Sequence, residues 1–125
     1  MIVRKYLPKD YGDIEEWYGD WGFIPPRSSS ITENCYMIDG VAAGFLIKTD
    51  TDICFFEGFV TNPKVESNKR SEALNLLTEK LLGIAKDLGF KEIWVLCKHN
   101  SIKQRAERFG FAYHGKFNML SKGVE

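Results

Sequence analysis

The sequence lacks the features that would direct it to a membrane or to an oxidising compartment. No apolar stretch approaches the roughly 20 residues that a transmembrane helix needs, and the N-terminus, MIVRKY, lacks the apolar core of a signal peptide. The three cysteines, Cys35, Cys54 and Cys97, show no CxxC spacing, and each lies within an apolar run. We therefore expect a cytoplasmic protein with buried thiols and without disulfide bonds or a metal site.

An excess of charge of one sign is also missing. The 17 Lys and Arg residues balance the 17 Asp and Glu residues, and the isoelectric point is about 6.7. Nothing in this balance favours broad attraction to nucleic acid or to anionic lipid. The sequence also has no internal repeat or low-complexity tract. Its 125 residues, 44% of them hydrophobic, suffice for one core, so we expect residues 1–125 to form a single globular domain.

The most informative feature that is present is a strand, loop, helix and strand in the second half. The apolar run Ile53–Thr61 predicts a strand, and the charged loop Lys64–Arg70 leads into an amphipathic helix over Ser71–Leu88. A second strand, Glu92–Cys97, is apolar on both faces, so we expect both faces to be covered. This order favours two parallel strands joined by a crossover helix.

Such a unit points the N-terminus of its helix at the carboxyl end of the first strand. The unpaired N–H groups and partial positive charge of a helix N-terminus favour an anion as ligand. Lys69 and Arg70 lie at this point. Cations are normally unfavourable there, which favours a bound phosphate over a loop that is merely solvated.

The remaining patterns predict a mixed α/β (α+β) fold with helices on both faces of the sheet. Asp39-Gly40 is a strong signal for a hairpin turn. The expected elements are a strand over Ile2–Tyr6, a helix from Lys9 to Trp21, hairpin strands Asn34–Ile38 and Val41–Thr49, a helix over Ser101–Phe109 capped by Asn100 or Ser101, and two closing strands within Phe111–Lys122.

Several strings resemble motifs of the GNAT superfamily of acyl-CoA-dependent N-acyltransferases. They are Val60-Thr61-Asn62-Pro63, the Leu-rich helix after the loop, Leu88-Gly89-Phe90-Lys91-Glu92-Ile93, and Arg108-Phe109-Gly110-Phe111. The expected order of elements, βα(α)βββαβαβ(β), is similar to that of the superfamily over essentially the whole chain. The aromatic, proline-containing segment Trp17–Pro26 is similar to one in small phage-encoded members.

The resemblance implies where acetyl-CoA, or another acyl-CoA, would bind. In the family the pantetheine arm of the cofactor pairs with the strand backbone at the positions of Phe59, Val60 and Thr61. The pyrophosphate lies on the next loop and helix N-terminus, which correspond here to Ser67, Asn68, Lys69, Arg70 and Ser71.

Two departures from the family pattern affect the cofactor loop and the general acid. Lys69 and Ser71 stand where the family has glycines, which let a backbone approach a pyrophosphate closely. Lys69 would either obstruct that approach or add formal charge to the helix dipole. Ala106 stands where a tyrosine often serves as general acid, which leaves Tyr113 and His99 as the nearest candidates. His99 follows a strand, where catalytic groups often lie, although a surface role is the alternative.

Acyl transfer to an amine requires removal of a proton from the nucleophile. Glu57 is the only charged residue in the apolar run Ile53–Thr61, and desolvation would raise its pKa and suit it to act as a general base. The alternative is a side chain that faces outward. Trp17 is expected in the core, whereas Trp21 and Phe23 are candidates for an acceptor pocket.

These patterns lead to one functional hypothesis and one alternative. The hypothesis is an N-acetyltransferase that transfers an acetyl group from acetyl-CoA to a primary amine by direct attack. The amine would belong to a small molecule or a protein, the first helix and the Pro25-Pro26 connector would form the acceptor side, and a homodimer is one option for assembly. The alternative is a non-catalytic protein of the same fold that binds a protein or nucleic-acid partner.

Overall fold

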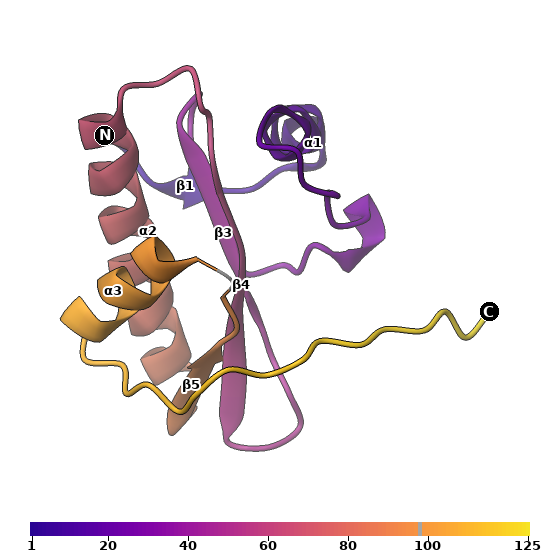
Figure 1. The fold of residues 1–125 in the computed structure, drawn as a ribbon, viewed down its shortest axis with the longest axis vertical. Helices are drawn as coiled ribbons and strands as arrows, with labels where there is room; N and C mark the ends of the chain where they lie inside the picture. Colours follow the sequence, from indigo (N-terminus) through magenta and orange to yellow (C-terminus); the bar gives the residue numbers. More distant parts are fainter. Residues whose placement is uncertain (98) are drawn as a thin grey trace.

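A five-stranded mixed sheet forms the centre of the protein, in a computed structural model that describes residues 1–97 and 99–125 (Figure 1). The first four strands pair antiparallel in sequence order. The fifth strand is parallel to the fourth, as the crossover unit predicted. The strands are β1 (Arg4–Lys5), β2 (Cys35–Ile38), β3 (Ala42–Ile47), β4 (Ile53–Thr61) and β5 (Glu92–Val95). The helices are α1 (Tyr11–Asp20), α2 (Ser67–Asp87) and α3 (Asn100–Arg108), with 3-10 turns at Pro8–Asp10 and Ser28–Ser30.

The helices cover the two faces of the sheet unequally. Figure 1 shows α1 on one face and both α2 and α3 on the other, which confirms the expected fold class. Trp17 of α1 packs on Met37, and Leu81 of α2 packs on Leu46 and Phe56. All five of these side chains are buried, so Trp17 belongs to the core as expected. No helix within residues 1–97 and 99–125 is both long and apolar enough to cross a bilayer.

The crossover helix begins earlier than the sequence suggested. Helix α2 starts at Ser67, so Lys69 and Arg70 lie in its first turn, and the prediction of a loop reaching Arg70 is wrong. The reason lies in Asn62, whose Oδ1 accepts the Lys64 N–H at 3.0 Å and whose Nδ2 donates to the Gly40 carbonyl at 3.0 Å. This turn reverses the chain quickly and leaves only a few residues between β4 and α2.

The fifth strand is shorter and more exposed than expected. Strand β5 ends at Val95, and the Trp94 side chain is 47% exposed on the α1 side of the sheet. The prediction of a strand covered on both faces is therefore wrong, because α1 packs over β2, β3 and the end of β4. Cys97 is exposed for the same reason, whereas Cys35 and Cys54 are buried as expected.

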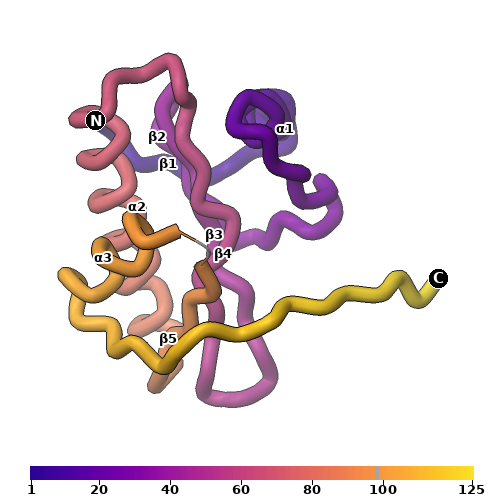
Figure 2. The backbone as a smooth tube through the Cα atoms, viewed as in Figure 1, coloured from indigo at the N-terminus to yellow at the C-terminus, as the bar shows by residue number. Residues whose placement is uncertain are grey.

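The ends of the chain also differ from their predicted structure. Strand β1 is reduced to two residues, and α3 has His99 at its N-cap without a side-chain hydrogen bond, so the predicted caps are wrong. The closing strands do not form: residues 112–125 contain no strand. Figure 2 shows this C-terminal segment extending away from the sheet. Their apolar side chains, such as Phe117 and Leu120, are exposed. The sheet therefore ends at β5, whose outer edge has no partner within the described chain.

Asp10 joins the N-terminal strand to the start of α1. Two Arg4 nitrogens, Nη1 and Nη2, donate to the Asp10 carboxylate at 2.8 Å each, and the Leu7 N–H donates to it at 2.7 Å. The hydrogen bonds from Arg4 hold the pKa of the Asp10 carboxyl below its ordinary value. A depressed pKa means that Asp10 stabilises the fold fully above the unfolded-state pKa of about 3.9, and that this contribution disappears as pH falls through the folded-state value.

We expect Asp10→Asn to lower the free energy of unfolding by about 2 kcal/mol near neutral pH, because a largely buried charge-assisted pair is lost. Urea unfolding at neutral and acid pH measures this difference, which should shrink as wild-type Asp10 becomes protonated. Asp13→Asn, an exposed position of α1, is the matched control and should have little effect. A difference that stays constant down to about pH 2 would argue against this role for Asp10.

Candidate active site

The site begins where β4 separates from β5. The parallel pairing of the two strands ends at Phe56 and Val95, whereas β4 continues to Thr61 with only β3 as a neighbour. The edge of β4 from Glu57 to Thr61 therefore has no strand partner on the β5 side within the described residues. An extended chain can pair with a free strand edge of this kind. We call this free edge, from Glu57 to Thr61, the β4 opening.

A bulge in β4 lies at the start of the opening. The register between β3 and β4 shifts between Ala43 and Phe45, which places an extra residue on β4. Gly58 has φ of +64°, and a Cβ atom at this position would lie 2.0 Å from Cε1 of Phe45. Only glycine fits both the backbone conformation and the space, so Gly58 fixes the direction of the neighbouring Glu57.

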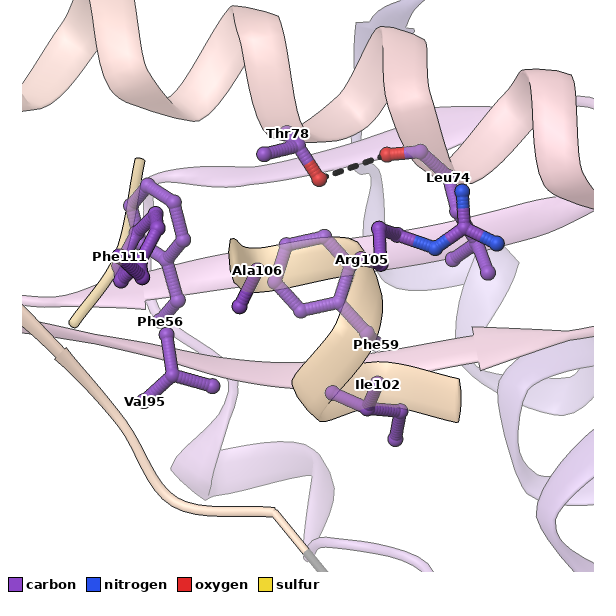
Figure 3. Close-up of a pocket in the computed structure, with 9 residues that line it drawn as sticks. All are labelled: Phe56, Phe59, Leu74, Thr78, Val95, Ile102, Arg105, Ala106 and Phe111. Carbon is purple, nitrogen blue, oxygen red and sulfur yellow. Dashed lines mark hydrogen bonds between the residues drawn. The ribbon is translucent and has the colours of Figure 1, made fainter. Parts of the chain in front are cut away.

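An apolar pocket lies on the α2 side of the opening (Figure 3). It contains about 420 Å³ of empty space, including its open mouth. Ala106 lines it, and its small side chain leaves room there. Strands β4 and β5, helices α2 and α3, and the segment after α3 contribute its lining: Phe56, Phe59, Leu74, Thr78, Val95, Ile102, Arg105, Ala106 and Phe111.

A wider cleft lies on the α1 side of the sheet at the same place along β4. It holds about 680 Å³ of empty space, including its mouth. Helix α1 and the Pro25-Pro26 connector form one side of this cleft, as the sequence suggested for an acceptor side. Its lining residues are Tyr18, Ile24, Pro25, Pro26, Phe45, Glu57, Gly58 and Met119. The pocket and the cleft thus flank the bulge from opposite faces.

Glu57 lies in this cleft, with its side chain open to solvent. The side chain is exposed and its Oε1 accepts the Gly58 N–H at 3.1 Å. Of the two alternatives for Glu57, the outward-facing side chain is the one observed, because Glu57 pairs with Phe45 on the α1 face and points away from the core beneath α2. An exposed carboxylate in a cleft can still attract a cationic amine and accept its proton.

Tyr18 is a site residue that the sequence did not single out. It lines the cleft together with Glu57, and burial raises the pKa of Tyr18 to about 12, with a further contribution from the negative charge of Glu57. Its hydroxyl therefore stays protonated at neutral pH and can donate a hydrogen bond. The only signal in the sequence is a hydroxyl on an otherwise apolar helix stripe, and that pattern is more often core.

The first turn of α2 lies just beyond the end of the opening. No side chain caps this helix, and within the described residues no acceptor binds the backbone N–H groups of Ser67, Asn68 or Lys69. Lys69 is exposed. Three free donors, the positive end of a 21-residue helix and a lysine offer an anion direct hydrogen bonds and favourable charge.

Arg105 of α3 supports this turn from the side of the pocket. Its Nη1 donates to the Ser71 carbonyl at 3.1 Å and to Oδ1 of Asn75 at 2.5 Å, and its Nη2 donates to Oγ of Ser71 at 3.2 Å. Ser71 is thus engaged with the protein itself. Burial lowers the pKa of Arg105. The group remains a cation, because the ordinary pKa of an arginine is very high. Sequence reasoning missed Arg105, because its partners are more than 25 residues away.

The remaining candidates lie in three different places. Val60 is buried against α1, so only its backbone can serve a ligand, whereas Phe59 lines the apolar pocket. The Lys103 ammonium nitrogen lies 4.6 Å from the centre of the Tyr113 ring, and the centres of the His99 and Phe23 rings are 5.7 Å apart. No hydrogen bond within the described residues joins Glu57 to His99 or Tyr113. The three residues therefore do not form a hydrogen-bonded network within the described part of the chain.

Residues that could bind a metal are not gathered at this site. Within residues 1–97 and 99–125, no group of three or more His, Cys, Asp or Glu side chains is close enough to hold an ion.

Comparisons with known proteins place the fold. No model of a known protein family matches the sequence, and no curated protein matches it either. A protein of Thermus thermophilus superimposes with a TM-score of 0.72 at 13% identity, over 100% of this chain and 98% of its own. Rv2747 from Mycobacterium tuberculosis, solved in complex with CoA, has a TM-score of 0.66 at 14% identity, over 86% of this chain and 70% of its own.

An aminoglycoside N-acetyltransferase, AAC(6')-Iy, also in complex with CoA, superimposes with a TM-score of 0.65. It shares 15% identity, over 98% of this chain and 100% of its own. The resemblance to phage-encoded members stays a prediction. At these identities the comparisons establish architecture, and the chain has the fold of the GNAT acetyltransferases.

Proposed function

We propose that this protein is an acyl-CoA-dependent N-acetyltransferase that acetylates a primary amine. The observation that carries the proposal is the β4 opening, flanked by the apolar pocket and by the cleft of Glu57, with an uncapped helix N-terminus at its end. Two proteins with this fold are described as complexes with CoA, which supports CoA as a ligand here.

The residues present fit an acyl-CoA. The free edge of β4 offers backbone groups to the amides of the pantetheine arm, and the apolar pocket accommodates its hydrocarbon part. The first turn of α2 offers the backbone N–H groups of Ser67, Asn68 and Lys69, and the Lys69 ammonium, to the pyrophosphate. Lys69 replaces a family glycine, and its exposed side chain leaves the N–H groups accessible. When bound, acyl-CoA supplies an activated thioester.

The chemistry assigned to the protein is positioning and proton transfer. Glu57 attracts the ammonium form of an amine into the cleft and accepts a proton as the amine attacks. Tyr18, protonated at neutral pH, donates a hydrogen bond inside the same cleft. His99 and Tyr113 remain the candidates for protonating the departing thiolate. The aromatic and proline side chains around Glu57 offer apolar contacts to the carbon chain of an amine on a small molecule or a protein.

A CoA-binding measurement tests the proposal and separates it from the non-catalytic alternative. We expect acetyl-CoA and CoA to bind to the protein by calorimetry, and acetyl-CoA at about 100 times its dissociation constant to add about 2.7 kcal/mol of stability. Lys69→Ala should weaken CoA binding at least tenfold, because a charge-assisted contact to phosphate is lost.

Lys86→Ala, in the last turn of the same helix, is the matched control and should leave CoA affinity unchanged. Absence of any CoA binding would support a non-catalytic role for the fold. Binding that is insensitive to Lys69→Ala would move the pyrophosphate away from the first turn of α2.

A further inference from the structure

Trp21 occupies a place that the sequence did not suggest. Its indole Nε1 donates a hydrogen bond of 2.7 Å to the Thr61 carbonyl, the last residue of β4. The cleft around Glu57 is instead lined by residues that follow Trp21 in the chain, Ile24, Pro25 and Pro26. Trp21 is therefore at the end of the β4 opening, on the path between the opening and the first turn of α2.

The strand register shows which edge the Thr61 carbonyl faces. The Asn62 N–H donates to the Val41 carbonyl at 2.8 Å, so the backbone of Asn62 points toward the β2–β3 hairpin. Neighbouring residues of a strand direct their backbone groups to opposite edges. Thr61 therefore points its carbonyl to the β5 side, and the indole of Trp21 takes up a hydrogen-bonding position on the free edge.

The chain after α1 holds Trp21 in this place. Gly22, with φ of +78°, ends the helix, and the Phe23 N–H donates to the Tyr18 carbonyl at 2.8 Å. Phe23 then reaches the His99 ring at the start of α3. Trp21 on the β4 side and Phe23 on the β5 side thus bridge the opening near the carboxyl ends of the two strands.

Trp21 also contacts Arg70, a partly buried cation in the first turn of α2. The Arg70 guanidinium carbon lies 5.6 Å from the centre of the Trp21 ring, and its Nη1 donates to the Val65 carbonyl at 2.5 Å. Arg70 is therefore folded back over the loop and away from the free N–H groups of the turn. Movement of the indole would remove the aromatic partner of this cation.

We propose that Trp21 is a cofactor-site residue whose indole is displaced from the Thr61 carbonyl by the pantetheine arm. An amide N–H of the arm takes over the hydrogen bond to Thr61, so one bond breaks as an equivalent one forms. The displaced ring is 40% exposed and borders solvent, which lets it move without disrupting the core. This inference rests on the proposed function, because it requires a CoA thioester as ligand.

The test compares Trp21→Phe with wild type by calorimetry and by the indole N–H resonances of ¹⁵N-labelled protein. Phenylalanine keeps an aromatic ring beside Arg70 but cannot donate to Thr61. Since a net hydrogen bond no longer competes with the ligand, we expect Trp21→Phe to bind CoA about two- to tenfold more tightly. The indole resonance that Trp21→Phe lacks should shift when CoA is added to wild-type protein.

Adenosine 3′,5′-bisphosphate, which has phosphates but no pantetheine arm, is the ligand control. It should bind wild type and Trp21→Phe equally and leave the Trp21 resonance in place. Trp94→Phe, which removes another exposed indole, is the protein control and should leave CoA affinity unchanged.

The outcomes separate this inference from the proposed function. CoA binding that is equal or weaker in Trp21→Phe, or a Trp21 resonance that CoA leaves unmoved, overturns the displacement while the proposed function stands. Failure of CoA to bind wild type, Trp21→Phe and Trp94→Phe alike overturns both.

Discussion

Gly58→Ala is expected to destabilise the protein by about 2–5 kcal/mol and to distort the site in the molecules that fold. An alanine at φ of +64° costs about 1–2 kcal/mol in backbone strain. Its Cβ would also lie 2.0 Å from the Phe45 ring, and overpacking of a core typically costs about 1–3 kcal/mol. Phe45 is buried, so its ring cannot swing into solvent to make room. Denaturant unfolding with a linear extrapolation measures the loss.

Gly83→Ala is the matched control. Gly83 lies within α2, has no positive φ, and a Cβ there would meet nothing within 4 Å. The same chemical change should therefore stabilise the protein by about 0.5–1 kcal/mol, because alanine favours the helix. Equal changes in the free energy of unfolding for the two substitutions would show that neither the backbone conformation of the bulge nor the contact with Phe45 requires glycine at position 58.

Local patterns were enough to predict most of the framework. Asp39-Gly40 identified the hairpin, and Gly40 indeed has φ of +71° in the turn between β2 and β3. The apolar period of the crossover helix identified Leu77 and Leu81, both fully buried. These features depend on residues close together in sequence, so their signals do not require knowledge of the tertiary structure.

The site was harder to predict because its geometry depends on distant segments. The bulge at Gly58 depends on the register between β3 and β4, and the separation of β5 from β4 has no local signature. Trp21 was expected near an acceptor, but its indole binds a carbonyl 40 residues away. A donor at the end of a helix pattern does not reveal which backbone acceptor it will meet.

Strand patterns at the C-terminus were misleading for a related reason. Alternation near His114-Gly115 suggested closing strands, but a strand forms only when an edge is paired with it. The outer edge of β5 and the residues after Phe111 remain unpaired within the described chain. Trp94 of β5 is exposed on the α1 side of the sheet, because α1 packs over β2, β3 and the end of β4 and does not cover β5.

Exposure of Glu57 changes what its role as a base requires. A buried carboxylate would gain basicity from desolvation, but an exposed one must rely on its position beside the amine and on the concentration of amine that its charge attracts. Its Oε1 is held by the Gly58 N–H, which orients the carboxylate within the cleft. The structure thus supports a positional origin for any catalysis by Glu57.

Glu57→Gln is accordingly expected to lower turnover by about 10²–10⁴-fold while CoA affinity stays the same. Glutamine preserves the size of the side chain and can still accept the Gly58 N–H, but it cannot take a proton from the amine. A thiol-release assay, with polyamines, amino acids, aminoglycosides and protein extracts screened as acceptors, provides the turnover. Glu15→Gln, at an exposed position of α1 outside the cleft, is the control for loss of a surface charge. If Glu57→Gln retained about half of wild-type turnover or more at every pH tested, proton removal would have to occur through water, since an amine that is already partly neutral needs little help from a carboxylate.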